Sequence, residues 1–317
     1  MKKGWVLIMG FLVLLSCAPA VVDQVVHGVL IAGSVQVNSG NYNAVYWDNG
    51  VLHVLDTRNS FVYHSFRDGS DLYVLGYYYD TFGDRHYGYW KNGVFVALGY
   101  TFSSVKKIAV ANGKVYVAGK LTNTSAGYWE NGVYHAVYAS DHYFMQATGI
   151  AVSGTNIAVV GSTNFLYSEG YWLNSVYHEV TNFTGWYSPY YVGDVLRILC
   201  RTNSNELGYF EDGTYSTIIA TNFYPQSVDV YGTNIYICGN IPIDGNQIPC
   251  YLKNGQLFQL DTTLPYGSIG KTIQYNGEIY FAGMVTDNTN MNACCWKITG
   301  ACSILDTRES LAELIND

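Results

Sequence analysis

Charged side chains are scarce in this chain. Asp, Glu, Lys and Arg make up 13% of its 317 residues, whereas about a quarter is usual for a soluble domain. The charges also lean to the acidic side, with a formal net charge of −8. A surface that binds nucleic acid carries a basic stripe, so the composition argues against a nucleic-acid partner.

Recognisable catalytic and metal-binding motifs are missing as well. The chain contains no Gly-x-Ser-x-Gly elbow in a strand-to-helix context and no glycine-rich phosphate loop. The cysteine spacings do not match a zinc site, and His178-Glu179 lacks the second histidine of a zinc-protease helix. We therefore predict no catalytic residue, no metal and no cofactor.

The N-terminal apolar stretch, residues 5–15, is too short for a membrane-spanning helix, which needs about 20 residues. Lys2 and Lys3 precede it, as in a secretory signal. The following Leu-Leu-Ser-Cys, residues 14–17, resembles the lipobox of bacterial lipoproteins, which are cleaved before the cysteine and acylated on it. We predict a signal peptide over residues 1–16, lipidation at Cys17 and a short lipidated tether over residues 17–23, with plain secretion as the alternative.

A phrase of the form Gly-Tyr-Trp-x-Asn-Gly recurs along the rest of the chain. Its aromatic or apolar anchors are Trp47, Trp90, Trp129, Trp172, Phe210, Leu252 and Trp296, spaced 38 to 44 residues apart. This period fits the four-stranded blade of a β-propeller. The segments between anchors carry β-branched and aromatic runs such as Val115-Tyr116-Val117, which are typical of strands.

Two short turns divide each repeat into four strands, A to D. Asn112-Gly113 separates strands A and B of the third repeat, and Asn131-Gly132 separates strands C and D. Asn-Gly is the favoured two-residue hairpin turn because both positions accept positive φ. The B–C and D–A connections are longer and more variable, so we expect one trimmed face and one elaborated face.

The fold class we predict is all-β: a seven-bladed β-propeller of four-stranded antiparallel blades over residues 24–305, with six or eight blades as alternatives. The first strand A is expected at residues 24–27 and the last strand D at residues 301–305. Beyond them, Asp306 and Glu309 resemble a capping box, and Leu311, Leu314 and Ile315 share one helical side. We therefore predict a short helical tail over residues 306–317.

The cysteines and histidines follow the repeat. Six cysteines remain after Cys17, an even number that permits disulfides in an exported chain. Cys238, Cys250 and Cys294, however, occupy slots filled elsewhere by small or aliphatic residues, which favours buried thiols. The three histidines that follow their anchors by six residues, His53, His135 and His178, fall on strand D of different blades and cannot share a metal.

Candidate contact residues lie in the long connections, because variable loops on a rigid scaffold are where binding residues gather. The first group is a charged cluster in a B–C loop. The second group is aromatic and polar and lies in D–A loops. The residues of the two groups are Asp80, Asp84, Arg85 and His86, and then Asp141, His142, Tyr143, Asn182, Trp186, Tyr187, Phe223 and Tyr224.

The repeated phrases resemble those of uncharacterised bacterial propeller lipoproteins and, more distantly, kelch and YVTN-type repeats. The kelch Gly-Gly pair is absent, and the resemblance carries over no catalytic residue. It implies a propeller at the bacterial cell envelope. Ala18, which follows the lipidated cysteine, argues against inner-membrane retention and so favours the outer membrane.

The function we predict is a membrane-tethered, monomeric binding or scaffold module for a protein or glycan. Its contact with the membrane would be through the lipid anchor only. The alternative is a carbohydrate-active or other hydrolytic enzyme with its site at the channel mouth, for which Asp229 is the clear inner-strand carboxylate.

Overall fold

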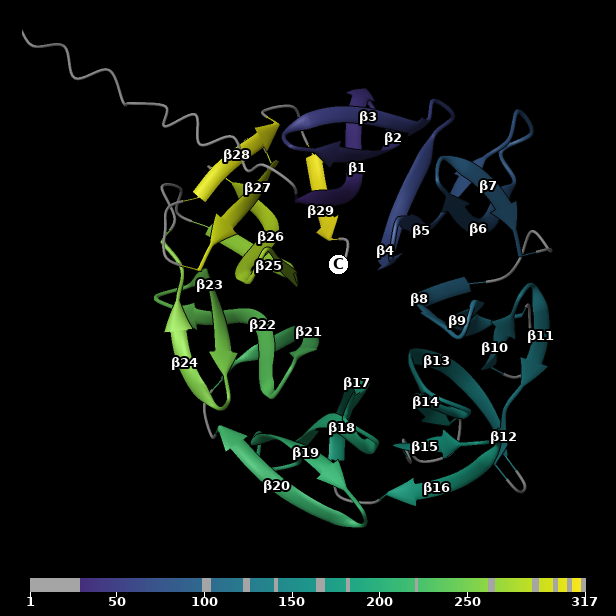
Figure 1. The fold of residues 1–317 in the computed structure, drawn as a ribbon, viewed down its shortest axis with the longest axis vertical. Coiled ribbons are helices and arrows are strands. Elements are labelled where there is room, and N and C mark those ends of the chain that lie inside the picture. The colour runs from purple at the N-terminus through teal and green to yellow at the C-terminus, as the bar shows by residue number, and fades with distance from the viewer. Residues whose placement is uncertain are drawn as a thin grey trace, which may run out of the picture.

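In the computed structural model, seven β-sheets stand like blades around a central axis (Figure 1). The structure describes residues 29–98, 104–121, 126–139, 142–163, 169–180, 183–219, 222–261, 266–286, 291–298, 302–306 and 310–314. Each blade is antiparallel, and the described part of the chain contains strands and turns but no helix. The predicted seven-bladed propeller is confirmed.

Each blade extends outward from an innermost strand beside the axis. Blade one is β29 (Ser310–Leu314), β1 (Leu30–Asn38), β2 (Asn41–Asp48) and β3 (Val51–Asp56); blade two is β4 (Ser60–Asp68), β5 (Asp71–Tyr79), β6 (Arg85–Lys91) and β7 (Val94–Ala97). Blade three is β8 (Ser104–Ala111), β9 (Lys114–Lys120), β10 (Ala126–Glu130) and β11 (Val133–Ala136). Blade four is β13 (His142–Ser153), β14 (Asn156–Thr163), β15 (Glu169–Leu173) and β16 (Val176–Val180), with the short β12 (Tyr138–Ala139) paired to the start of β13.

The remaining three blades repeat the plan. Blade five is β17 (Phe183–Val192), β18 (Val195–Thr202), β19 (Leu207–Glu211) and β20 (Thr214–Ile219); blade six is β21 (Tyr224–Tyr231), β22 (Asn234–Ile243), β23 (Asn246–Lys253) and β24 (Gln256–Gln259). Blade seven is β25 (Tyr266–Tyr275), β26 (Glu278–Thr286), β27 (Met291–Lys297) and β28 (Cys302–Asp306).

The ring closes through its C-terminal strand, which corrects the predicted helical tail. Ser310–Leu314 forms β29 and pairs antiparallel with β1, with Gly33 opposite Ala312. It takes the innermost position of blade one, which was expected for residues 24–27; those residues lie outside the described part of the chain. Without β29, β1 would present an unpaired edge. The hydrogen bonds that β29 makes with β1 therefore outweigh the local preference for a helix.

The asparagine of the repeated phrase ties the C–D turn to strand B in four blades. Asn92 Oδ1 accepts a hydrogen bond from the backbone N–H of Leu72 at 2.8 Å, while the Asn92 N–H donates to the Leu72 carbonyl at 2.9 Å. Asn131, Asn174 and Asn254 make the same pair of bonds in their blades. Asn92 itself has a φ of 50°, as the hairpin turn requires. The phrase is therefore constant for a structural reason.

The glycine of the phrase is matched to an aromatic ring on strand D. A Cβ at Gly88 would lie 2.5 Å from the Phe95 ring and 2.3 Å from the Val96 carbonyl oxygen. Gly127, Gly170 and Gly208 likewise lie under tyrosine rings on strand D. In the other three blades, the position equivalent to Gly88 holds Val45, Cys250 or Cys294. The position equivalent to Phe95 on strand D then holds Leu52, Leu257 or Cys302. In the four blades with glycine, the missing side chain thus makes room for a ring on strand D.

The cysteines confirm the buried-thiol interpretation. Cys200, Cys238, Cys250, Cys294 and Cys295 are buried and Cys302 is half-buried, and within the described residues no disulfide joins them. Burial raises the pKa of the Cys238 and Cys250 thiols to about 12.

The three repeat histidines have a packing role. His53, His135 and His178 each lie opposite the tyrosine of the phrase and stack on it, with ring centroids 4.7, 5.0 and 4.6 Å apart. They belong to the outermost strands of blades one, three and four, as predicted.

Nowhere in the described ranges is there a helix with the length and apolar character needed to cross a membrane.

Candidate functional site

The B–C loop of blade two brings four of the predicted contact residues together. Asp80, Asp84, Arg85 and His86 lie where β5 turns into β6, around a tight turn over residues 80–84. The predicted D–A group is less coherent. β13 already contains His142 and Tyr143, and β17 contains Trp186 and Tyr187, so these four lie in inner strands rather than in loops.

Phe223 and Tyr224, the last two residues of that group, differ in exposure. Phe223 is fully buried in the core between blades five and six, so its ring is not available to a partner, which corrects the prediction. Tyr224 is 47% exposed, and the Arg201 guanidinium lies 5.8 Å from its ring centroid. Asp141 and Asn182 lie outside the described residues.

Asp80 organises the blade-two loop. Its Oδ1 accepts hydrogen bonds from the N–H groups of Phe82 at 2.8 Å and Asp84 at 3.0 Å. Its Oδ2 lies 2.8 Å from His86 Nε2, and this bond, together with the backbone donors, lowers the pKa of the Asp80 carboxyl. Gly83, with a φ of 85°, completes the turn. One carboxylate thus fixes a loop that would otherwise be free to move.

The fixed loop exposes one aromatic ring. Phe82 is 90% exposed, more than any other large hydrophobic side chain of the described residues. Such exposure is unusual for phenylalanine, because burying the ring would remove a large apolar area from water.

Arg85, three residues after Phe82, contacts tyrosines of β5 and β6. Its Nε donates to the Tyr79 hydroxyl at 2.7 Å, and its guanidinium lies 5.0 Å from the centroid of the Tyr77 ring. These contacts orient the guanidinium, while the residue remains exposed. Arg is among the residues enriched at the energetic centres of protein interfaces.

The D–A connection between blades one and two borders this loop. Arg58 from that connection lies 3.2 Å over the centroid of Tyr78, which also stacks on His86 at 4.9 Å. Asp56 holds Arg58 through two side-chain hydrogen bonds of 2.9 and 2.6 Å. Here, as predicted, a B–C loop and a D–A loop share one face of the ring.

A second polar region lies at the centre of the ring, where six inner strands carry the same irregularity. A β-bulge interrupts the pairing of β4, β8, β13, β17, β21 and β25 at equivalent points. The residue after the bulge is His64, Lys107, Gly149, Ser188, Ser227 or Lys271 in turn. Bulges re-aim side chains, and these bulges form a ring of positions around the axis. The register of β29 puts Glu313 at the matching position of blade one.

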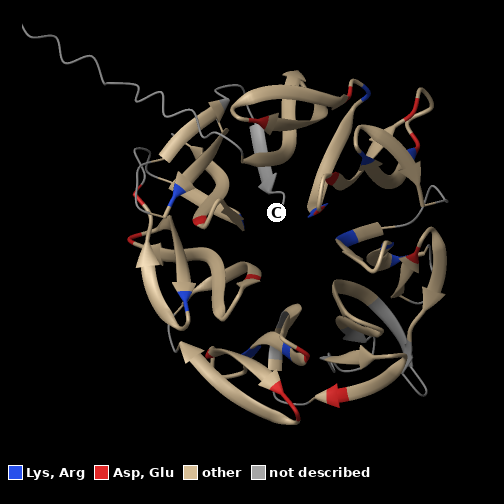
Figure 2. Ribbon diagram, viewed as in Figure 1, with Lys and Arg blue, Asp and Glu red and all other residues tan. Residues whose placement is uncertain are grey.

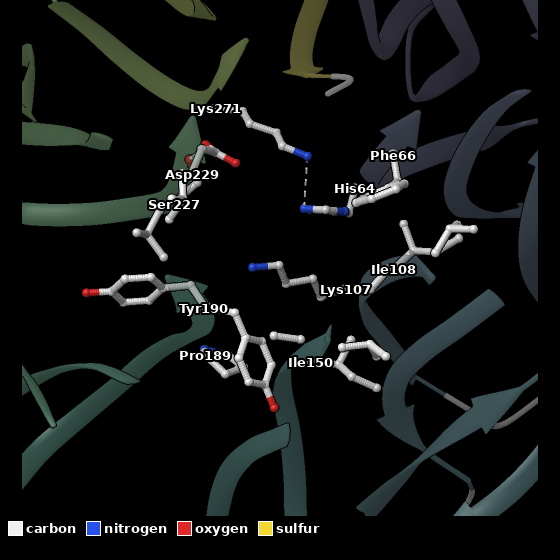
Figure 3. A pocket seen from close by; sticks show the side chains of 17 residues that line it. His64, Phe66, Lys107, Ile108, Ile150, Pro189, Tyr190, Ser227, Asp229 and Lys271 are labelled. Atoms are coloured by element: carbon white, nitrogen blue, oxygen red, sulfur yellow. Dashed lines mark hydrogen bonds between the residues drawn. The ribbon is translucent and has the colours of Figure 1, made fainter. Parts of the chain in front are cut away.

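Lys107 and Lys271 extend toward the axis from opposite parts of this ring, with His64 between them (Figure 3). Lys107 Nζ donates to Ser188 Oγ at 2.5 Å, and Lys271 Nζ donates to the Ser65 carbonyl at 2.8 Å and lies 3.4 Å from His64 Nε2. Burial, together with the charges of Lys271 and Lys107, holds the pKa of His64 well below its usual range. Burial also lowers the pKa of Lys107, which the carboxylate of Asp229 partly offsets.

Asp229, the inner-strand carboxylate, lines the same region. It accepts hydrogen bonds from Ser227 Oγ at 3.0 Å and from the Thr272 N–H at 3.3 Å. It is the one carboxylate among the described residues that line the two central cavities. No group of three His, Cys, Asp or Glu side chains suited to a metal occurs in the described ranges.

The central lysines are not among the sequence-predicted site residues, because carboxylates are the groups that a hydrolase would place on the inner strands. Aligning the six inner strands at their bulges would identify these lysines. The position after the bulge holds His, Lys, Gly, Ser, Ser and Lys, none of which is a large apolar residue. Figure 2 shows how few charged residues the whole ring carries, so two lysines at its axis are a marked departure from the rest of the chain.

Comparison with known structures establishes the fold. The chain is similar to a puromycin-hydrolyzing peptidase from Mycobacterium tuberculosis, with a TM-score of 0.61 and 10% identity over 88% of this chain and 52% of that one. It is similar to the β-propeller domain of the Trilobed protease from Pyrococcus furiosus, with a TM-score of 0.57 and 8% identity over 89% and 94% of the two chains.

TolB from Acinetobacter baumannii is a third similar structure, with a TM-score of 0.52 and 11% identity over 90% of this chain and 64% of that one. The chain spans about half the length of the peptidase and under two thirds of TolB. No family model and no curated protein sequence matches it. At these identities the likeness shows a β-propeller and does not assign an activity.

Proposed function

We propose that this protein is a binding module that holds a protein partner through the β5–β6 loop, with Phe82 as the central contact. The observation that carries the proposal is the 90% exposed Phe82 ring on a turn fixed by three side-chain interactions of Asp80. A rigid loop loses little conformational entropy on binding. An aromatic anchor beside an exposed arginine matches the composition of interface hot spots.

The neighbouring residues supply a polar rim. Asp84 and Arg85 are exposed at the end of the turn where β6 begins, and Arg58 from the preceding connection contacts Tyr78. Charged rim residues contribute to orientation and association rate more than to affinity. We therefore assign Phe82 the main share of the affinity, and Asp84 and Arg85 the specificity.

Affinity capture from the native envelope tests this proposal. The wild-type protein is compared with Phe82→Ser and with the matched control Val94→Ser, which removes a 68% exposed apolar side chain beside a C–D turn of the same blade. We expect a partner that is retained by wild type and by the control and lost with Phe82→Ser. Equal capture by all three proteins would refute the role of this loop.

A glycan partner is the other outcome to examine. Aromatic rings also stack on sugar faces, so the same three proteins are applied to a glycan array. Glycan binding that depends on Phe82, with no protein captured, would replace the protein partner with a glycan. The β5–β6 loop would still be the binding site.

We further propose that the protein is exported and tethered to the cell envelope through acylated Cys17, on the outer membrane. Its support is the Lys2-Lys3, apolar and Leu-Leu-Ser-Cys order of the N-terminal sequence. Metabolic labelling with a fatty acid should mark the wild-type chain and not Cys17→Ser. Labelling of both, or of neither, would contradict lipidation at this cysteine.

A further inference from the structure

Two cavities on the propeller axis share residues that follow the bulges of the inner strands. One has a volume of about 320 Å³ and the other about 190 Å³, and both are lined by His64, Lys107, Ser227 and Lys271. The smaller cavity includes the bulged residues Tyr63, Lys106, Thr148 and Gln226, near the strand ends that join the D–A loops. The larger cavity continues toward the A–B turns. The shared residues therefore form the neck between them.

The neck concentrates positive charge in an enclosed space. The ammonium groups of Lys107 and Lys271 are both close enough to His64 to disfavour its protonation and lower its pKa, so the imidazole is neutral at neutral pH. Asp229 faces the larger cavity, Lys106 faces the smaller one, and Glu313 holds the matching register position on β29. Among the side chains that the structure describes, the groups that line the neck are thus two ammonium ions, a neutral imidazole and the hydroxyls of Ser188 and Ser227.

Beyond the neck, the larger cavity has a different chemistry. Its lining includes Phe66, Ala109, Ala151 and Tyr191 as well as the polar neck residues. A cavity of about 300 Å³ or more with a few convergent polar groups is the size and kind that holds small ligands. The Tyr191 hydroxyl is buried and has no hydrogen-bond partner, so one polar atom on this side is also unsatisfied.

We propose that the channel binds a small organic anion, with its carboxylate at Lys107 and Lys271 and its apolar body in the larger cavity. The ammonium groups and hydroxyls of the neck are hydrogen-bond donors for a carboxylate, and charge-assisted bonds in an enclosed site are stronger than in water. The apolar lining favours an aromatic or aliphatic body over a bare inorganic ion. This site is separate from the β5–β6 loop and does not depend on its function.

Thermal unfolding of the purified protein with defined probes tests the proposal. The probe is phenylacetate; acetate and inorganic phosphate carry charge without an apolar body, and 2-phenylethanol carries the body without charge. We expect phenylacetate to raise the unfolding midpoint by about 2 °C or more in a saturable manner, and the other probes to have smaller effects. An equal effect of 2-phenylethanol, or no effect of phenylacetate at tens of millimolar, would overturn the proposal.

Substitutions place the effect at the neck. Lys107→Met should abolish the shift with phenylacetate, and Ser188→Ala should weaken it, because Ser188 holds the Lys107 ammonium. Lys114→Gln removes a lysine that is exposed on β9 and paired with Glu130, and it should leave the shift unchanged. A shift that survives in Lys107→Met would contradict the assignment.

His64 provides a readout that needs no variant. A bound carboxylate adds negative charge at the neck, so the pKa of His64 should rise when phenylacetate is added, as followed by NMR of the imidazole protons. A His64 pKa that stays constant while phenylacetate stabilises the protein would place the anion elsewhere and overturn the proposal.

Discussion

Removing β29 perturbs the closure of the ring directly. Five residue pairs join β29 to β1, and alternate pairs of an antiparallel ladder exchange two hydrogen bonds, so about five backbone bonds are lost. At about 1 kcal/mol each, the free energy of unfolding falls by about 5 kcal/mol, a large part of the 5–15 kcal/mol typical of proteins. Deletion of residues 307–317 should therefore lower the urea midpoint steeply, as followed by tyrosine and tryptophan fluorescence.

Two controls separate strand loss from simple shortening. Deletion of residues 315–317, which lie beyond β29, should leave the urea midpoint nearly unchanged. A synthetic peptide of residues 307–317 should restore part of the stability of the longer deletion, because it can pair with the exposed edge of β1. An unchanged midpoint in the longer deletion would refute closure by this strand.

Three further predictions follow from buried groups. The pKa of His64 is well below 6.5 in the folded protein, so below pH 6.5 the unfolded chain binds more protons than the folded one. The free energy of unfolding should therefore decrease as the pH is lowered below 6.5. In urea titrations at several pH values, His64→Gln should reduce this pH dependence by at most about 1.4 kcal/mol per pH unit. Iodoacetamide should modify half-buried Cys302 well before Cys238 or Cys250, whose pKa burial raises to about 12; equal labelling by mass spectrometry would contradict this order. Gly88→Ala should lower the free energy of unfolding by about 1–3 kcal/mol, because the added Cβ would meet the Phe95 ring. Phe95→Leu in the same chain should recover part of this loss. If the effects of the two substitutions simply add in a double-mutant cycle, the Phe95 ring is not what the Cβ meets.

The repeat made most of the fold predictable. Each turn has a chemical signature, such as Asn131-Gly132, and each anchor, such as Trp129, is buried in a core shared with the preceding blade. Local sequence therefore determined strand order and blade number.

The closing strand was not predictable in this way, because its reason lies at the other end of the chain. Residues 310–314 have leucines at helical spacing, and nothing nearby signals that β1 lacks an inner neighbour. The same limit applies to the channel. Lys107 and Lys271 are 164 residues apart in sequence, and only the circular arrangement brings them to one axis.

The loop site was predictable in position but not in organisation. The length of the connection between two strand patterns located the β5–β6 loop, and its charged residues, Asp80 and His86 among them, were its predicted contacts. Their mutual hydrogen bond, however, shows that these two mainly hold the turn. The residue that the turn presents, Phe82, carries no distinguishing sequence signal because aromatic residues are common throughout the chain.

The central claim is that the β5–β6 loop, and not the opposite face, contacts the partner. Site-specific photo-crosslinking in intact cells measures this directly, with a benzophenone amino acid at position 82 or at position 94 of the same blade. We predict a discrete crosslinked species from position 82 and none from position 94. Crosslinking from position 94 alone, or equally from both, would contradict the account.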